Sequence, residues 1–201
     1  MSDWNQFYEA TEKTPAEATL GFACDRVSDE LPKVAIDCGC GGGRNTPFLR
    51  SRGFEVHGFD PDAQGIERCR NRFADDNQVF LSCESFTSFD YPSASLVLAS
   101  YSLFFCPVDD FDQAWSKIKS SIVPGGVFCG TFLGKQDSWA MADSDRKGRG
   151  VISHTLDEIQ ALLTNFDIEE TDIKNFDGVT ATGTKKHWHA ITMVARKRAQ
   201  V

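Results

Sequence analysis

An apolar segment that runs directly into a cluster of glycines is the feature that most constrains how this chain folds. The run is Val34-Ala-Ile-Asp-Cys-Gly-Cys-Gly-Gly-Gly-Arg44, and it predicts a β-strand, a glycine loop and then a helix. Glycines allow a sharp turn and a close approach of the backbone to a ligand, while the free N–H groups of the following helix face that ligand. The run therefore predicts a site for a nucleotide-type cofactor.

An acidic residue closes the next apolar strand. Asp60 ends the segment 55–60, so it is expected beside the glycine loop, where its carboxylate can accept hydrogen bonds from both hydroxyls of a ribose. The alternative role for Asp60 is a plain helix cap before Pro61. The order of strand, glycine loop, helix, strand and acid is shared by proteins that bind NAD and proteins that bind S-adenosylmethionine (SAM), so it does not separate the two classes.

The rest of the chain alternates apolar strand-like runs with amphipathic stretches, which predicts an α/β domain with a largely parallel sheet. Two consecutive strand-like runs near the end predict an antiparallel hairpin at one sheet edge. We therefore expect a Rossmann-like three-layer sandwich whose seven-stranded, mostly parallel sheet ends in a C-terminal antiparallel hairpin. The predicted strands are 34–37, 55–60, 78–84, 95–100, 127–132, 168–173 and 187–197, and the predicted helices are 44–52, 62–73, 110–122 and one that opens with a capping box at Thr155 and Glu158.

Composition and charge limit the kind of protein. A length of 201 residues predicts one domain, with residues 1–29 as an N-terminal helical cap and 30–201 as the Rossmann-like core. No window approaches the roughly 18 apolar residues of a membrane span, and no signal peptide is evident, so we expect a cytoplasmic protein. The net charge of −8 disfavours nucleic acid as a partner, and the seven scattered cysteines are expected to be reduced, without a metal site.

Three observations favour SAM over a dinucleotide. The position that needs a third glycine in a dinucleotide fingerprint is Arg44. Asp37 begins the pattern Asp-x-Gly-x-Gly-x-Gly, which places a carboxylate where the positively charged amino group of the methionine part of SAM can be received. The closing hairpin is also foreign to an NAD domain.

These motifs, with Pro124-Gly125-Gly126 before the fifth strand, resemble those of class I SAM-dependent methyltransferases over about residues 30–198. The strings Gly-Gly-Gly-Arg-Asn45 and 190–197 resemble the bacterial tellurite-resistance type, a group similar to thiopurine methyltransferases. The resemblance implies SAM as methyl donor, S-adenosyl-L-homocysteine (SAH) as product and a small-molecule acceptor. It leaves open the acceptor, the atom that is methylated, the use of a base, and whether the protein is a monomer or a homodimer.

The resemblance also implies roles for individual residues. Asp37 and the glycines line the methionine part, Asp60 binds the ribose, and Glu84 reads the adenine amino group. A solvated Glu84, and an Arg44 that only supports the loop, are the open alternatives. The expected cofactor-binding residues are Asp37, Gly39, Cys40, Gly41, Arg44, Asp60, Pro61, Glu84, Ser85, Phe86, Ser100 and Tyr101.

The acceptor is expected beside the last strand. Alternation puts His187 and His189 on one face and Trp188 on the other. The candidate catalytic residues are His187, His189 and Tyr101, which is expected beside the sulfonium. Half-buried edge-strand packing is the alternative role of the two histidines. The loop that joins the last two strands, 174–186, is expected at the edge of the glycine loop. Other expected lining segments are 134–139, the basic loop 146–149, and the aromatic N-terminus with Trp4, Phe7 and Tyr8.

The expected reaction is an in-line displacement in which alignment and exclusion of water do most of the catalysis, because the positive sulfur already activates the methyl group. A base is needed only when the nucleophile must lose a proton. The competing hypotheses are a non-catalytic SAM-binding regulatory protein and an NAD(P)-dependent oxidoreductase.

Overall fold

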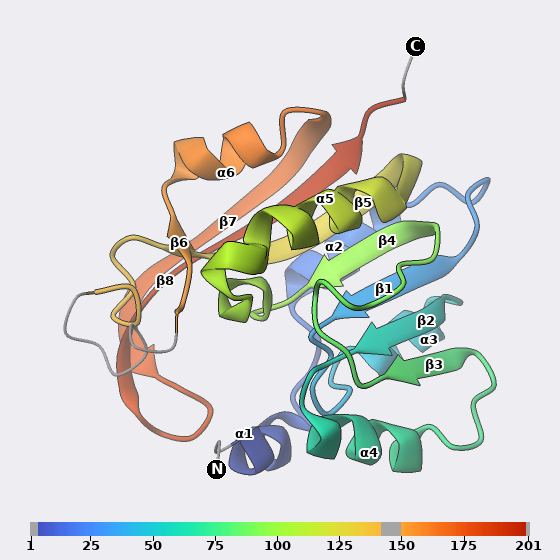
Figure 1. Cartoon of the computed structure of the whole chain (residues 1–201), viewed down its shortest axis with the longest axis horizontal. Helices are drawn as coiled ribbons and strands as arrows, with labels where there is room; N and C mark the ends of the chain where they lie inside the picture. Colours follow the sequence, from blue (N-terminus) through green and yellow to red (C-terminus); the bar gives the residue numbers. More distant parts are fainter. Residues whose placement is uncertain (1–3, 142–149, 200–201) are drawn as a thin grey trace.

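The computed structural model describes residues 4–141 and 150–199, and these form a single sheet with helices on both faces (Figure 1). The strand order is β3-β2-β1-β4-β5-β8-β7, and a two-residue strand, β6 (Ser153–His154), pairs with β5. Strands β1 to β5 pair in parallel, whereas β8 runs antiparallel to both β5 and β7. The predicted Rossmann-like sheet with a C-terminal antiparallel hairpin is thus confirmed.

The element bounds follow the sequence pattern closely in the first half of the chain and less closely in the second. The strands are β1 (Val34–Cys38), β2 (Glu55–Phe59), β3 (Val79–Ser82), β4 (Ala94–Ala99), β5 (Ile122–Gly134), β7 (Phe166–Val179) and β8 (Lys185–Lys197). The helices are α1 (Trp4–Thr11), α2 (Ala18–Arg26), α3 (Thr46–Ser51), α4 (Ala63–Arg72), α5 (Phe111–Ser121) and α6 (Leu156–Leu162), with the 3-10 turns η1 (Leu103–Phe105) and η2 (Val108–Asp110).

The capping box predicted at the start of α6 is present. The Thr155 backbone N–H donates to Glu158 Oε2 at 2.7 Å, and the Glu158 N–H donates to Thr155 Oγ1 at 3.2 Å. The two bonds satisfy N–H groups that the first turn of a helix leaves without intrahelical partners. The helix ends at Leu162, so Phe166 starts β7 instead of ending the helix.

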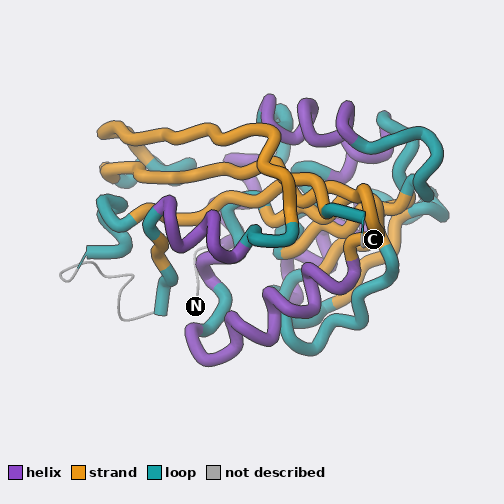
Figure 2. The backbone as a smooth tube through the Cα atoms, turned by 90° about the horizontal axis from the view of Figure 1, so that it is seen from above, coloured by secondary structure: helices purple, strands orange, loops and turns teal. Residues whose placement is uncertain are grey.

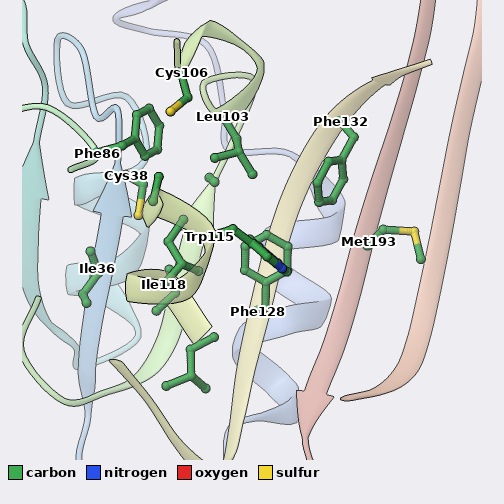
Figure 3. Close-up of a cluster of buried hydrophobic side chains, with 14 of the residues drawn as sticks. Ile36, Cys38, Phe86, Leu103, Cys106, Trp115, Ile118, Phe128, Phe132 and Met193 are labelled. Carbon is green, nitrogen blue, oxygen red and sulfur yellow. The ribbon is translucent and has the colours of Figure 1, made fainter. Parts of the chain in front are cut away.

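Helices lie on both sides of the sheet (Figure 2), and buried apolar side chains form one core layer on each face. Strand alternation divides the side chains of β4 between them: Leu96 and Leu98 pack with α2 and α3, whereas Val97 and Ala99 pack with α5 and α6. Figure 3 shows part of the second layer, where the Trp115 and Phe128 ring centroids lie 5.0 Å apart. Because β4 is buried on both faces, its apolar residues do not alternate with exposed polar residues.

Helix α2 belongs to this core instead of covering the open edge of the site. Leu20, Ala23 and Cys24 are buried against the sheet face and pack with Leu98 and Val127. Within residues 1–29, which were expected to form a helical cap, this helix is therefore part of the core. Among the described residues it is α1 that approaches the cofactor edge, next to α4 (Figure 1).

The hairpin is much longer than the sequence predicted. Residues 174–186 were expected to form a loop, yet Lys174–Val179 continues β7 in register with Lys185–Ala190 of β8. Only a short turn remains, in which the Thr180 N–H donates to the Thr184 oxygen at 2.8 Å. The loop prediction was wrong because the polar composition of this stretch concealed its alternation: Lys174 and Phe176 share one face of β7. In Figure 1 the turn lies at the same end of the molecule as α1.

None of the helices in the described part of the chain is long and apolar enough to cross a membrane. The seven cysteines are free, and six of them are buried as predicted, whereas Cys83 is exposed.

Candidate cofactor and acceptor site

A cavity of about 890 Å³ lies where the carboxyl ends of β1, β2 and β4 meet the hairpin and α1. Its walls include the glycine loop, the turn after β2, the segment 85–87 after β3, and residues 100–102 after β4. In open α/β sheets, ligands bind in the crevice outside the carboxyl ends of the strands, and drug-sized ligands occupy about 300–1,000 Å³. The volume is large enough for a nucleoside cofactor together with a small second molecule.

The glycine loop is held against β2 and has no room for a side chain at Gly41. The Gly39 and Cys40 N–H groups both donate to the Phe59 oxygen, at 2.8 and 2.9 Å. Gly41 has φ +52, and a Cβ placed there would lie 2.8 Å from the Tyr8 ring. The conformation and the close contact with α1 therefore both require glycine at position 41.

Asp60 lies in the cavity wall directly beside this loop. Its Oδ2 accepts from the Gly41 N–H at 2.9 Å, and its Oδ1 accepts from the Asp62 N–H at 2.8 Å. Each carboxylate oxygen has a further lone pair, so both can accept one more hydrogen bond. Burial raises the pKa of Asp60 above its ordinary value. The carboxylate thus fixes the loop and still has acceptors for ligand hydroxyls.

Asp37 occupies a different place from the one expected. It is 1% exposed and does not line the cavity, and its Oδ2 has no hydrogen-bond partner among the described residues. Burial, together with the charge of Asp60, raises the pKa of Asp37 to about 7. A direct contact of this carboxylate with the amino group of a ligand does not follow from that position, because Asp37 is buried and is not part of the cavity wall.

A different acid, Glu17, lines the cavity next to the glycine loop. Its Oε2 accepts from Lys174 Nζ at 2.8 Å, and its Oε1 accepts from Arg44 at 3.3 Å. Burial acts to raise the pKa of Glu17, but Lys174 and Arg44 outweigh it and hold the pKa below its ordinary value. The sequence reasoning missed Glu17 and Lys174, which are 157 positions apart.

Tyr101 lies at the junction of this polar cluster and the aromatic side of the cavity. Its hydroxyl lies 3.3 Å from Lys174 Nζ, and its backbone has φ +53, which is unusual for a residue other than glycine. Strained backbone of this kind occurs often at functional sites. Ser100 lies in the wall beside it, as predicted.

On the other side of Asp60, the register of the predicted adenine contacts is shifted by one residue. Ser85, Phe86 and Thr87 line the cavity with Pro61, whereas Glu84 does not. The Glu84 N–H donates to the Asp60 oxygen at 3.2 Å and so continues the pairing of β2 with β3. Because this residue is still part of the ladder, the wall of the cavity begins only after it.

The two histidines of the last strand share one face, as predicted, but it is the face away from the cavity. Trp188 and Ala190 line the cavity, and neither His187 nor His189 does. His187 makes hydrogen bonds across the hairpin, with Nδ1 at 2.6 Å from Asp177 and Nε2 at 2.8 Å from Asn175. Their placement contradicts a direct contact with an acceptor in this cavity and agrees with edge-strand packing.

The remaining expected lining segments have mixed outcomes. Trp4, Phe7 and Tyr8 of α1 line the cavity, as does Trp139 of the segment 134–139. The basic loop 146–149 lies outside the described residues. No group of three or more histidine, cysteine, aspartate or glutamate side chains in residues 4–141 and 150–199 has the arrangement of a metal site.

The sheet order, the glycine loop and the neighbouring acid at the strand edge define the fold of class I SAM-dependent methyltransferases. Residues 35–126 match a family model described as a methyltransferase domain. The predicted resemblance to class I SAM-dependent methyltransferases is confirmed by this match and, at the level of the fold, by the solved structures described below.

Similar curated proteins are carboxy-S-adenosyl-L-methionine synthases. That of Shewanella denitrificans is 32% identical over 117 residues, which are 55% of this chain and 48% of the relative. That of Shewanella frigidimarina is 30% identical over 82 residues, which are 39% of this chain and 34% of the relative. In the longer of these two matches, the chain spans about half the length of the curated relative.

Solved structures share the fold at low sequence identity. TehB from Haemophilus influenzae superimposes with a TM-score of 0.77 at 16% identity, over 96% of this chain and 66% of that chain. A SAM-dependent methyltransferase from Methanosarcina mazei has a TM-score of 0.70 at 16% identity, with 92% and 100% coverage. Magnesium protoporphyrin IX methyltransferase from Synechocystis, solved with bound SAM, has a TM-score of 0.69 at 14% identity, with 98% and 92% coverage.

Proposed function

We propose that this protein is a SAM-dependent methyltransferase that transfers a methyl group to a small molecule and releases SAH. The observation that carries the proposal is the position of Asp60 beside the glycine loop, in the wall of a cavity of about 890 Å³. A ribose-accepting carboxylate there, with a loop that a Cβ at Gly41 would obstruct, fits a nucleoside cofactor. SAM supplies a methyl group that its positively charged sulfur makes electrophilic.

The residues around the cavity divide into three groups by the part of the cofactor they would hold. Asp60 accepts hydrogen bonds from the ribose hydroxyls, and Pro61 with the segment 85–87 flanks the adenine. The loop 39–41 and Arg44 border the methionine part, where Glu17 takes the role that the sequence assigned to Asp37. Ser100 and Tyr101 border the reacting methyl group.

The chain's own contribution to the reaction is orientation and exclusion of water. Helix α1 covers the loop through Tyr8, and Tyr101 is fixed by Lys174 on one side and by the Trp188 ring on the other, 5.9 Å away between centroids. Burial raises the pKa of Tyr101, so its hydroxyl keeps its proton at neutral pH, while its oxygen accepts a hydrogen bond from Lys174 Nζ at 3.3 Å. Holding two reactants in line is the main requirement of such a displacement.

We further propose that the chain forms one cytoplasmic domain in which helix α1 caps the cavity, and that it acts as a monomer or homodimer without nucleic-acid partners. The negative net charge supports the last point. A SAM-binding regulatory protein without turnover is the competing function. The likeness to carboxy-S-adenosyl-L-methionine synthases covers about half of those enzymes, so their reaction is a separate possibility for the same cofactor site.

Isothermal titration with SAM, SAH and NADH tests the cofactor. We expect SAM and SAH to bind with similar affinity and NADH not to bind, because Arg44 stands where a dinucleotide needs glycine. Binding of NADH without SAM would overturn the proposal. Chromatographic detection of SAH formed in the presence of acceptors then separates an enzyme from a regulatory protein.

A further inference from the structure

Six aromatic side chains form an unbroken series of ring contacts in the wall of the cavity, and we call this series the aromatic belt. Adjacent ring centroids lie 6.4, 5.3, 5.9, 5.7 and 5.9 Å apart. All these separations fall within the range of favourable aromatic pairs. In order along the wall, the belt consists of Tyr8, Trp4, Phe105, Trp139, Trp188 and Tyr101.

The two ends of the belt lie at the proposed cofactor site. Tyr8 packs against the glycine loop, and Tyr101 contacts Lys174 next to Glu17. Between these ends the rings come from α1, η1, the loop after β5 and the hairpin strand β8. The space that the belt encloses therefore begins where the proposed cofactor ends, which is where an acceptor must lie for methyl transfer.

The far side of the belt is built to stay in place. Asp137 is fully buried, and its carboxylate accepts from the backbone N–H groups of Trp139 and His189, each at 3.0 Å. It also pairs with the buried Lys186. The Lys186 ammonium lies 4.1 Å from the Trp139 ring centroid and 4.4 Å from that of Trp188. Trp139 and Trp188 are thus fixed in advance, which lowers the entropy cost of binding a ring against them.

The charges around the cavity favour an acceptor that is not an anion. The described lining contains five carboxylates, of which Glu17 is paired with the only two cations of that lining, Arg44 and Lys174. The aromatic belt itself carries no side chain that takes up a proton at neutral pH. A nucleophile that must lose a proton before it attacks therefore finds no base among the belt residues.

From the aromatic belt, the acidic lining and the lack of a base in the belt, we infer that the acceptor is a flat, uncharged N-heterocycle that is methylated on its ring nitrogen. This inference rests on the proposed function. The nitrogen lone pair forms the new N–C bond while the C–S bond breaks and leaves its electron pair on sulfur. The products are SAH and an N-methyl heterocyclic cation, and no proton is released. Aromatic faces stabilise both the flat ring and its positive charge.

Binding to the protein–SAH complex tests the inference without turnover. The probes are pyridine, quinoline and acridine as uncharged heterocycles, N-methylquinolinium as the product cation, and 2-naphthoate and selenite as anions. Titration calorimetry should show that at least one heterocycle binds, and that quinoline and N-methylquinolinium bind at least about tenfold more tightly than 2-naphthoate, because stacking is common to all three but charge is not. Incubation with SAM should yield N-methylquinolinium and SAH in equal amounts by mass spectrometry.

Variants of one belt residue connect the binding to the belt. Trp188→Leu should weaken quinoline binding about tenfold, while Trp188→Phe keeps a ring and should retain most of the affinity. Phe80→Leu is the matched control, because Phe80 is an exposed aromatic on β3 that does not line the cavity. All three variants should bind SAH within about twofold of the wild type. Trp188 lies at the acceptor end of the cavity, and Phe80 lies outside the cavity.

The outcomes separate the inference from the proposed function. If SAH binds but none of the three heterocycles does, or if an anion binds more tightly than all of them, the inference is wrong and the proposed function stands. Unchanged quinoline affinity in Trp188→Leu would also overturn it. If neither SAM nor SAH binds, the proposed function fails and the inference fails with it.

Discussion

Replacing Asp60 with alanine has two consequences, because this carboxylate has two tasks. It accepts the Gly41 and Asp62 N–H groups at 2.9 and 2.8 Å, and in the proposed complex it also accepts the ribose hydroxyls. Alanine removes both acceptors. The Gly41 N–H then faces the cavity and can find water, whereas the ribose loses a charged partner that water replaces poorly inside the closed site.

The two effects have different magnitudes. A hydrogen bond to a charged group contributes about 1.5–3 kcal/mol, but burial of the Asp60 carboxylate opposes its two bonds and raises its pKa, so the free energy of unfolding should fall by no more than about 1.5 kcal/mol. For a chain of this size each kcal/mol lowers the melting temperature by about 2–4 °C. The loss of ribose contacts should weaken SAM binding by about 1–3 kcal/mol, which is about 5- to 150-fold in Kd.

Calorimetric titration with SAM and thermal melting of the unliganded protein measure the two quantities separately. The matched control is Asp90→Ala, which alters an exposed aspartate that does not line the cavity, and it should change neither quantity. The titration is done well below the lowered melting temperature, so that the variant is folded. A folded Asp60→Ala protein with wild-type SAM affinity would refute the assignment of Asp60 to the ribose.

Three further predictions concern the loop, the polar cluster and the buried acid. Gly41→Val should abolish measurable SAM binding, because φ +52 and the Tyr8 ring exclude a β-branched side chain; a folded variant that binds normally in the same titration would contradict this. Lys174→Met should weaken SAM binding several-fold with little loss of stability, because it frees Glu17 from one of its two cations; an unchanged Kd would exclude the cluster from the cofactor site. Burial raises the pKa of Asp37 from 3.8 to about 7, so the folded protein holds this proton more tightly than the unfolded chain. That contribution is present below pH 4 and is lost as the pH rises to 7, by up to about 4 kcal/mol. Urea denaturation of the unliganded protein should show this decline, and Asp37→Asn should flatten it; parallel curves for the two proteins would contradict the assignment.

Several of the expected cofactor-binding residues line the cavity, and their positions follow from segments that are close together in the chain. The glycine loop follows β1 directly, and Asp60 follows the next strand, so both positions are set by the lengths of two strands and one helix. In a parallel sheet these ends must meet at one edge. Ser85, Phe86, Ser100 and Tyr101 line the cavity for the same reason.

Contacts between distant segments were not predictable in this way. Glu17 precedes α2 and Lys174 lies in β7, and their ion pair depends on how far the hairpin extends beyond the sheet. Asp37 shows the converse error: the motif placed a carboxylate near the loop, but a pattern of residue types does not tell which side of the loop it occupies. Only the packing of β1 between β2 and β4 leaves it buried.

The last strand shows why a correct pattern still led to the wrong side chains. A period of two determines that His187 and His189 share a face opposite Trp188, but it does not determine which face meets the cavity. The structure shows which face it is: Trp188 and Ala190 lie on the same side of β8, and both line the cavity. In this arrangement Ala190 pairs with Leu133 of β5. A histidine pair attracts a catalytic interpretation more readily than a tryptophan does. Here the orientation of β8 places Trp188 in the wall of the cavity. On the other face, His187 bonds to Asp177 and Asn175 across the hairpin, and His189 Nδ1 accepts from the Gln136 N–H in the loop after β5.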